Sequence, residues 1–524
     1  MQSRAAPVVV ICGDVGAGPV PLRLGELAAQ LRREQSGAAP LLLHEICEAP
    51  QALVEALAST KPSRVVVGCR AASQRRGELL AHLRRAGVPA AGTVVVDLQT
   101  ADGCTEKVAL EQSVALLSAA VARVVGADLE APVKERTSLS AGGVSRRSLL
   151  YRVNTARRFV ATWRQDRCSG GVACAPCLLG CPHGALRREA RRVVVDGDRC
   201  NGCGVCVAAC RSGAFALPGA EVEGLSAAAA VLVAAIRRCR SATGVAIACQ
   251  HSKSVPRVGE PWLVLRVPSI EMVTAGWLLQ LVGAGAGVKV IGCDDEYCET
   301  RVADLEQFVR DLGGVLAFAD GRGAGGEALA DHEPVPTALA PGGDWIELWE
   351  PEATMRSLAA FGALGPGRTP WRAEGPGCSL GVVTIDPAGC SFCEVCVGIC
   401  STGALRAGQN GTGSLRLSVD PGRCTACGAC VTSCPEAAVT LERAVDGALL
   451  AAGRRVVARG PAVACETCGA PLVAGLSKAV LRRRLGESHP ALTAGTTMVC
   501  ADCRLGGRSL AASHRRATGE LLKG

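Results

Sequence analysis

The sequence predicts a multidomain protein of the α/β plus α+β class, with two doubly wound parallel-sheet domains, two small cysteine-rich domains and a cysteine-rich C-terminal tail. Three observations lead to this class. The chain has 524 residues, enough for about three to five domains. Strand and helix patterns alternate in two stretches, 8–125 and 225–325, which is typical of parallel sheets covered by helices. The 29 cysteines fall into groups with regular spacing.

The composition excludes disorder and suggests metal binding. Hydrophobic residues make up 48% of the chain and charged residues 20%, as in folded proteins. We expect no secretory signal, because the strand-like run 8–12 comes almost at once. The most apolar stretch, 227–236, is too short to span a bilayer. We therefore expect a cytoplasmic protein, without direct membrane insertion, whose reduced cysteines bind metal.

The first stretch predicts four strands, each followed by a helix. The strands are 8–12, 41–47, 64–69 and 93–98, and the helices are 22–33, 50–58, 74–86 and 107–125. Cys12, Cys47 and Cys69 close the first three strands, and Cys104 follows the fourth. Because the carboxyl ends of parallel strands meet at one edge of a sheet, we expect these cysteines to converge on a metal cluster. The alternative is four buried structural cysteines, since free cysteine packs like a small hydrophobe.

Two octets of cysteines repeat a compact spacing. The first octet is Cys168, Cys174, Cys177, Cys181, Cys200, Cys203, Cys206 and Cys210; the second is Cys390, Cys393, Cys396, Cys400, Cys424, Cys427, Cys430 and Cys434. Both match the bacterial two-cluster ferredoxin spacing, in which the fourth cysteine of each motif serves the other cluster. The first octet departs from it, because five residues separate Cys168 from Cys174 where two are usual. Arg211 and Ser401 also replace the usual proline.

Crossed pairing predicts four [4Fe–4S] clusters. Their ligand sets are Cys174, Cys177 and Cys210 with Cys168; Cys200, Cys203 and Cys206 with Cys181; Cys390, Cys393 and Cys396 with Cys434; and Cys424, Cys427 and Cys430 with Cys400. The alternative, a set of zinc knuckles, requires separate groups of four ligands and not interleaved octets. Short strands before the second motif of each octet, at 193–196 and 415–420, agree with ferredoxin domains.

The second alternating stretch predicts strands at 244–249, 262–267, 288–293 and 315–319, and a helix at 270–281. Cys249, Cys293 and Cys298 lie at or near the carboxyl ends of two of these strands. Farther along, two CxxC pairs, Cys465 with Cys468 and Cys500 with Cys503, provide four sulfur ligands. Such a set suits structural zinc in a zinc-ribbon-like tail, with rubredoxin-like iron or a further iron–sulfur cluster as the alternative.

Both sheet stretches resemble known iron–sulfur proteins. The segments 8–13, 45–47, 65–70 and 105–107 resemble the amino-terminal domain of the A-type subunit of heterodisulfide reductase and its relatives. This resemblance implies a [4Fe–4S] cluster on the four cysteines of the first stretch. The flavin domain of that family has no counterpart that we can identify in the sequence, so we expect no FAD. A short match to the dinucleotide fingerprint, Gly321-x-Gly323-x-x-Gly326, is too weak to indicate a cofactor site.

The second stretch resembles the delta subunit of methyl-viologen-reducing hydrogenase. The resemblance lies in the segments 247–252, 265–269 and 290–298, and the family binds a [2Fe–2S] cluster there. Ser252 and Ser269 stand where the family usually has cysteine. Cys249, Cys293 and Cys298 remain as possible ligands, with Cys239 and Cys378 as conceivable substitutes. We favour a docking domain that has kept the fold, with a [2Fe–2S] cluster as the alternative.

These features divide the chain into seven parts. They are an N-terminal α/β domain (1–130), a linker (131–148), a two-cluster ferredoxin domain (149–221), a delta-subunit-like domain (222–328), a linker (329–376), a second two-cluster ferredoxin domain (377–445) and the CxxC tail (455–510). Basic and apolar residues in 146–167 predict an amphipathic helix that packs on the first ferredoxin domain.

The sequence favours a multi-cluster electron-transfer subunit over an enzyme, because we find no catalytic residues in it. From the resemblances we expect it to connect a hydrogenase, formate dehydrogenase or heterodisulfide reductase-like module of anaerobic metabolism to an acceptor such as soluble ferredoxin. A flavin oxidoreductase and an iron–sulfur or zinc regulator that binds nucleic acid are the alternatives. We expect no nucleic-acid partner, because five clusters of charge about −2 each offset the formal net charge of +9.

Overall fold

The computed structural model describes most of the chain as two compact units. The units are Met1–Ser379 with Arg443–Ala448, and Leu380–Glu442 with Leu449–Gly524. The described residues are 6–13, 20, 22–35, 37–129, 133–135, 159–168, 176–190, 192–210, 214–239, 241–252, 254–311, 372–374, 380–409, 414–460, 465–469, 499 and 503.

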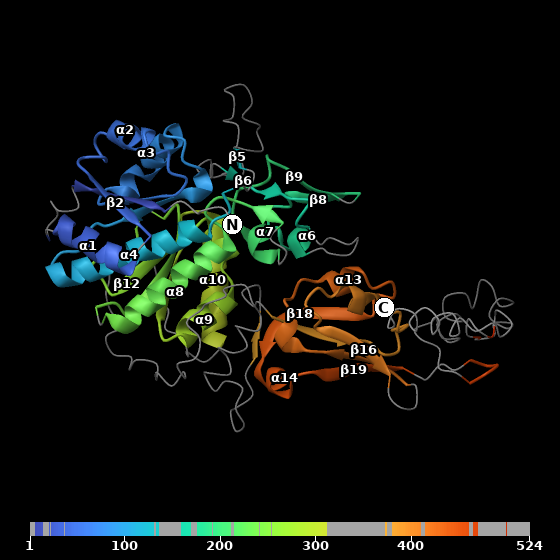
Figure 1. The fold of residues 1–524 in the computed structure, drawn as a ribbon. Coiled ribbons are helices and arrows are strands. Elements are labelled where there is room, and N and C mark those ends of the chain that lie inside the picture. The colour runs from blue at the N-terminus through green and yellow to red at the C-terminus, as the bar shows by residue number, and fades with distance from the viewer. Residues whose placement is uncertain are drawn as a thin grey trace, which may run out of the picture. The chain divides into compact units, whose positions relative to one another are not determined.

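The first unit begins with the expected parallel sheet. Its strands are β1 (Val8–Cys12), β2 (Ala39–Leu43), β3 (Val65–Cys69) and β4 (Thr93–Asp97), in the order β2-β1-β3-β4. The helices are α1 (Leu24–Glu34), α2 (Gln51–Ala58), α3 (Ala72–Arg85) and α4 (Glu106–Gly126), with a short turn η2 (Ala90–Gly92) before β4. Figure 1 shows α2 and α3 on one side of the sheet and α1 and α4 on the other. Because both faces are covered, the inner strands are rich in buried valine.

A second parallel sheet follows farther along the same unit. Its strands are β11 (Gly244–Cys249), β12 (Trp262–Val267) and β13 (Gly287–Ile291), in the order β12-β11-β13. Its helices are α8 (Val222–Arg238), α9 (Ala275–Gly283) and α10 (Glu296–Asp311). The single helix expected over 270–281 is instead a short turn, η3 (Ile270–Met272), followed by α9, because the Ser269 side chain caps η3 at the Glu271 amide. The fourth strand expected at 315–319 lies outside the described residues.

Helix α4 joins the two sheet domains. It packs along α8, and its Gln112 side chain donates hydrogen bonds to the carbonyl oxygens of Ser241 and Glu260. Arg123 donates to the carbonyl oxygen of Arg266 over 2.6 Å. In length and hydropathy α4 could cross a membrane, but 72% of its most apolar 18-residue window is buried inside the protein. We therefore interpret α4 as a core helix shared by two domains.

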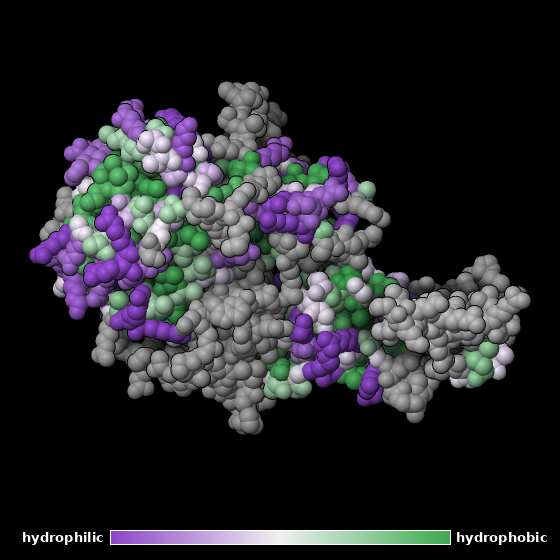
Figure 2. Space-filling view, in the orientation of Figure 1, coloured by the Kyte–Doolittle hydropathy of each residue, from purple (hydrophilic) through white to green (hydrophobic). Residues whose placement is uncertain are grey.

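The first ferredoxin domain is built from short paired elements in the same unit. Its strands are β5 (Lys134–Glu135), β6 (Phe159–Val160), β7 (Thr162–Trp163), β8 (Leu186–Glu189), β9 (Arg192–Val195) and β10 (Phe215–Ala216), and its helices are α6 (Pro176–Gly180) and α7 (Val205–Ala209). The helix predicted over 146–167 is wrong for 159–163, where aromatic and β-branched residues favour the extended backbone of β6 and β7. Residues 146–158 lie outside the described residues. The β8–β9 hairpin presents hydrophilic side chains on the face shown in Figure 2.

The second ferredoxin domain forms the core of the second unit. Its elements are β15 (Gly381–Ile385), α12 (Val395–Ile399), β16 (Leu405–Gln409), β17 (Leu415–Val419), η4 (Pro421–Arg423), α13 (Ala429–Thr432), β18 (Val439–Asp446), α14 (Gly447–Ala452) and β19 (Arg455–Gly460). β19 pairs antiparallel with β17, so the sheet extends past the boundary expected at residue 445. β14 (Arg372–Glu374) pairs antiparallel with residues 444–446, which belong to the first unit.

We predict that Gly224→Ala destabilises the first unit, because α4 and α8 touch there without side chains. A Cβ atom on Gly224 would lie 2.6 Å from the Arg123 carbonyl oxygen, and such overpacking costs about 1–3 kcal/mol. The control is Gly77→Ala in α3, where a Cβ meets nothing within 4 Å; it should stabilise by about 0.5–1 kcal/mol. Thermal unfolding of the two variants measures both effects. Equal melting temperatures would contradict the packing argument.

Candidate metal centres

The ferredoxin loops hold their cysteines on an unusual backbone. Residues beside the second cysteine of three motifs have positive φ: Gly202 and Gly204, Phe392 and Glu394, and Ala426 and Gly428. Alternating conformations of this kind turn successive amide N–H groups toward one point, which forms an anion-binding concavity. In the remaining motif the residues beside the second cysteine, Cys174, lie outside the described residues, and Pro176 begins α6 just before Cys177.

In the second unit, neighbouring sulfurs follow the crossed pairing. Burial raises the pKa of Cys396 to about 12, assisted by Cys390, Cys430, Cys393 and Cys434. Burial likewise raises the pKa of Cys430 to about 12, assisted by Cys424, Cys427 and Cys400. Thus Cys434 lies near the first motif and Cys400 near the second. The two sets of sulfurs also share one core, since Cys396, Cys424 and Cys430 are buried in the same cluster.

The first octet shows the same relation where it is described. Burial raises the pKa of Cys206 well above its usual value. The nearby thiols of Cys200, Cys181 and Cys177 raise this pKa further. Cys181, from the other motif, is therefore near Cys206, and Cys203 is buried in the same loop. Of the other predicted set, Cys168, Cys177 and Cys210 are described, and Cys174 lies outside the described residues.

Hydrogen bonds to sulfur repeat at the fourth cysteine of each motif, with one exception. The amides of Ala185, Ala214 and Ala438 donate to the sulfurs of Cys181, Cys210 and Cys434, four residues earlier, over 3.3–3.4 Å. At Cys400, Thr402 intervenes. Its hydroxyl lies 3.5 Å from the Cys400 sulfur and accepts from the Ala404 amide. Hydrogen bonds to sulfur tune cluster potentials, so Thr402 distinguishes this centre. The cysteine spacing gives no signal for this role.

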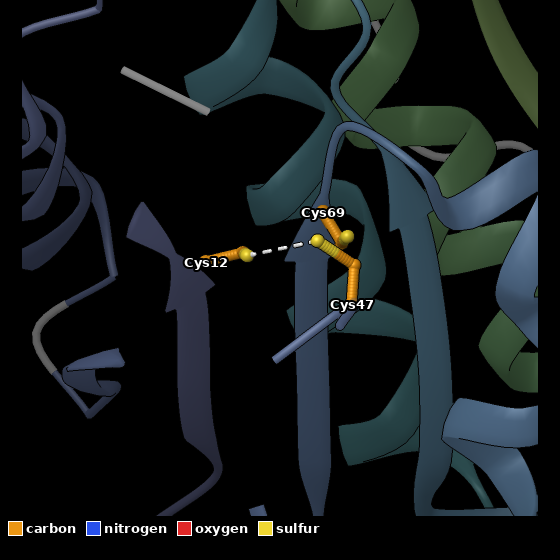
Figure 3. A group of neighbouring side chains, drawn as sticks. All are labelled: Cys12, Cys47 and Cys69. Atoms are coloured by element: carbon orange, nitrogen blue, oxygen red, sulfur yellow. Dashed lines mark hydrogen bonds between the residues drawn. The ribbon is translucent and has the colours of Figure 1, made fainter. Parts of the chain in front are cut away.

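Three cysteines converge at the edge of the N-terminal sheet. Figure 3 shows Cys12 and Cys69 at the ends of β1 and β3, with Cys47 reaching them from the connection after β2. The Cys12 and Cys47 sulfurs are 3.9 Å apart, and all three sulfurs lie within 4.8 Å of one another. The contact with Cys12 and burial raise the pKa of Cys69. Three buried thiols without a countercharge among them are a suitable donor set for a metal.

The structure does not bring the fourth predicted ligand, Cys104, into this group. Its thiol donates to the Thr105 carbonyl oxygen, and its sulfur lies against Gly259 of the neighbouring domain. Thr105 caps α4 by accepting from the Val108 amide, which fixes Cys104 at the helix start. The expected convergence of four cysteines is therefore observed for three.

A second group of three cysteines lies at the edge of the second sheet. The Cys249 sulfur is 3.5 Å from that of Cys293 and 3.9 Å from that of Cys298. The hydroxyl of the fully buried Ser269 lies 3.2 Å from the Cys298 sulfur, which makes the donor set three sulfurs and one oxygen. The hydroxyl of Ser252 instead donates to the Ser254 carbonyl oxygen.

The two conceivable substitutes do not complete this group. Cys239 ends α8, before β11 begins, and so lies at the opposite edge of the sheet from Cys249. Cys378 lies outside the described residues. Ser269 is therefore the described side chain best placed to act as a fourth ligand.

The C-terminal cysteines form a third compact group. Sulfurs of Cys465, Cys468 and Cys503 lie within 4.8 Å of one another, and Cys500 lies outside the described residues. Four sulfurs at about 2.3 Å from a zinc ion would be about 3.8 Å apart. The three described sulfurs fit such a site.

Comparison with known families supports the iron–sulfur interpretation. A 4Fe-4S dicluster domain model matches residues 389–438, and a 4Fe-4S binding domain model matches residues 193–216. No curated protein matches the chain. The first match spans all eight cysteines of the second octet, and the second match spans Cys200–Cys210. The protein is therefore an iron–sulfur cluster-binding protein with ferredoxin-like [4Fe–4S] domains and parallel α/β sheets.

We predict that Thr402→Val lowers the potential of the centre that includes Cys400. A thiolate ligand can only accept a hydrogen bond, so valine removes a donor that stabilises the reduced state. A bond worth about 0.5–1.5 kcal/mol corresponds to about 20–60 mV for one electron. Redox titration followed by paramagnetic resonance measures the shift. Thr432→Val is the control, because the Thr432 hydroxyl donates to backbone carbonyl oxygens; equal shifts would remove the special role of Thr402.

We also predict that Cys69→Ala removes the N-terminal cluster, about four iron atoms, while Cys104→Ala retains it. The reason is the position of the two sulfurs, one inside the group of three and one outside it. Iron analysis and the absorption spectrum of anaerobically purified protein measure the difference. Loss of the cluster in Cys104→Ala would identify Cys104 as the fourth ligand after all.

Proposed function

We propose that this protein is an electron-transfer subunit that passes single electrons between a partner oxidoreductase and an acceptor. The observation that carries the proposal is that the two crossed sulfur sets share one core in the second unit, where Cys396, Cys424 and Cys430 are buried in the same cluster. A bound [4Fe–4S] cluster supplies one-electron transfer. Two such clusters in one small domain would form a path for electrons and not a site that binds and converts a substrate.

The chain's own residues would hold the clusters and set their potentials. Burial gives Cys396, Cys424 and Cys430 raised pKa values, so their thiols stay protonated at neutral pH until metal replaces the protons. Amides and Thr402 donate to the ligand sulfurs, and each donor stabilises the reduced state. Differences between these donors give the centres different potentials, which sets the direction of electron flow.

We extend the proposal to three further centres. Cys12, Cys47 and Cys69 would hold a fifth [4Fe–4S] cluster, as the resemblance to the A-type subunit of heterodisulfide reductase implies. The cysteines at 465, 468, 500 and 503 would hold zinc. At Cys249, Cys293 and Cys298 we propose a [2Fe–2S] cluster in place of the cluster-free docking domain expected from the sequence. The three sulfurs and the Ser269 hydroxyl lie together, and this donor set supports a [2Fe–2S] cluster.

The resemblances to heterodisulfide reductase and hydrogenase subunits suggest the kind of partner. A hydrogenase, formate dehydrogenase or heterodisulfide reductase-like module in the cytoplasm would supply or take electrons, and soluble ferredoxin is a suitable acceptor. The hydrophilic β8–β9 hairpin includes Arg187, Arg188 and Arg192. Such a basic surface suits an acidic redox protein, because complementary charge accelerates association.

We predict about twenty-two iron atoms per chain, from five [4Fe–4S] clusters and one [2Fe–2S] cluster. The protein should be reduced reversibly by dithionite, without stoichiometric flavin. Iron, sulfide, zinc and flavin analysis of anaerobically purified protein checks the inventory. Eight or fewer iron atoms would contradict the cluster count. Bound flavin would favour a flavin oxidoreductase, and steeply salt-dependent DNA binding would favour a regulator.

A further inference from the structure

The first ferredoxin domain meets the second sheet domain at a buried contact between a histidine and a carboxylate. His183 follows Cys181 by two residues, and its Nε2 lies 2.8 Å from a Glu271 carboxylate oxygen. Only 9% of the His183 side chain and 5% of the Glu271 side chain are exposed. The His183 ring also packs edge-on against Tyr297, with 4.4 Å between ring centroids. The cluster loop is therefore fixed on η3 and α10 of the neighbouring domain.

The backbone of the ferredoxin domain also comes close to this surface. Gly204, whose φ is 85°, lies next to Met272, and a Cβ atom on Gly204 would be 2.9 Å from the Met272 sulfur. Gly204 follows Cys203 directly in the sequence. A larger residue would thus push the Cys203 loop away from η3.

The two oxygens of Glu271 serve different domains. One oxygen lies at hydrogen-bonding distance, 2.8 Å, from His183 Nε2. The other accepts a hydrogen bond of 3.0 Å from the Ser269 hydroxyl. Ser269 in turn lies 3.2 Å from the Cys298 sulfur. A Glu271 oxygen is also within 4.8 Å of the Cys203 sulfur, and one is within 4.8 Å of the Cys298 sulfur. The Glu271 carboxylate therefore lies between a ferredoxin ligand and the three-cysteine site, with the Asp295 carboxylate beside it.

Stability alone does not explain a charge at this place. Removing a carboxylate from water is costly unless it is paired, and apolar residues of similar size often hold an interface equally well. A negative charge beside two electron-accepting centres also makes their reduction harder. The Glu271 side chain does, however, hold the Cys203 loop close to the site of Cys249, Cys293 and Cys298.

We propose that electrons pass across the Glu271 junction, between the cluster of Cys181, Cys200, Cys203 and Cys206 and the centre of Cys249, Cys293 and Cys298. This inference rests on the proposed function. In the step, one centre loses one electron and the other gains it; no bond forms or breaks, and no further reagent takes part. His183 and Glu271 are positioning residues that hold the two centres together, and Ser269 links Glu271 to the second centre.

The first test is paramagnetic resonance of the full chain after anaerobic reduction. Two reduced centres at this separation interact magnetically, so the signal of the ferredoxin cluster should be broadened. Cys298→Ala should abolish the signal of the second centre and sharpen that of the first. A ferredoxin signal of equal width in the parent protein and in Cys298→Ala would overturn the proposal.

The second test leaves every cysteine in place. Glu271→Gln keeps the shape of the junction but removes a negative charge near both sites, so both midpoint potentials should rise in a redox titration. Glu221→Gln is the matched control. Glu221 accepts from the Gly219 amide at another contact of the same unit, and its replacement should move neither potential. A shift at only one centre, or at neither, would refute a shared junction.

The outcomes also separate this inference from the proposed function. Reducible ferredoxin clusters with an unbroadened signal would contradict the junction and leave electron transfer by the ferredoxin domains intact. Ferredoxin clusters that cannot be reduced reversibly would contradict the proposed function itself. In that case no electron could pass through the junction either, and both proposals would be contradicted.

Discussion

Crowding of buried thiols is the constraint on which most of this structure depends. Groups of three or more sulfurs gather at two sheet edges, in the ferredoxin loops and in the C-terminal tail. Buried thiols gain little from one another, and ionising them without a countercharge is costly. A metal centre resolves the conflict, because it replaces the protons and neutralises the thiolates. We therefore interpret the surrounding sheets and helices as supports for sites that are complete only with metal.

The supports are joined more closely than a series of separate modules. α4 belongs to the first sheet by sequence, yet it packs along α8 of the second sheet domain. Val258 pairs with the chain at Thr100, just before the Cys104 turn. The first ferredoxin domain is fixed to the same body through Arg123, which donates to the Gly219 carbonyl oxygen. These contacts join three cysteine-bearing regions within the first unit and set the distances on which the proposed electron transfer depends.

Local patterns could be predicted from the sequence, and contacts between distant residues could not. The strands ending at Cys12, Cys69 and Cys249 match the prediction closely, because valine runs and periodicity are local signals. The helix prediction fails for the strands at 159–163, where pairing with distant segments adds to the local β propensity and outweighs the amphipathic pattern. The Cys104 sulfur lies against Gly259, 155 positions away in the sequence, and the His183–Glu271 pair joins residues 88 positions apart. Neither contact has a local sequence signal.

Reciprocal ligation also affects how such a domain can evolve. In the second unit the last cysteine of each motif, Cys400 or Cys434, lies near the other motif, as reciprocal ligation would require. A deletion that removes one motif therefore takes a ligand from the centre that stays behind. Once a half-motif has been duplicated and its ligands exchanged, the two copies are inherited as a single unit. Divergence can then proceed only by substitutions around the sulfurs, such as the threonine at position 402.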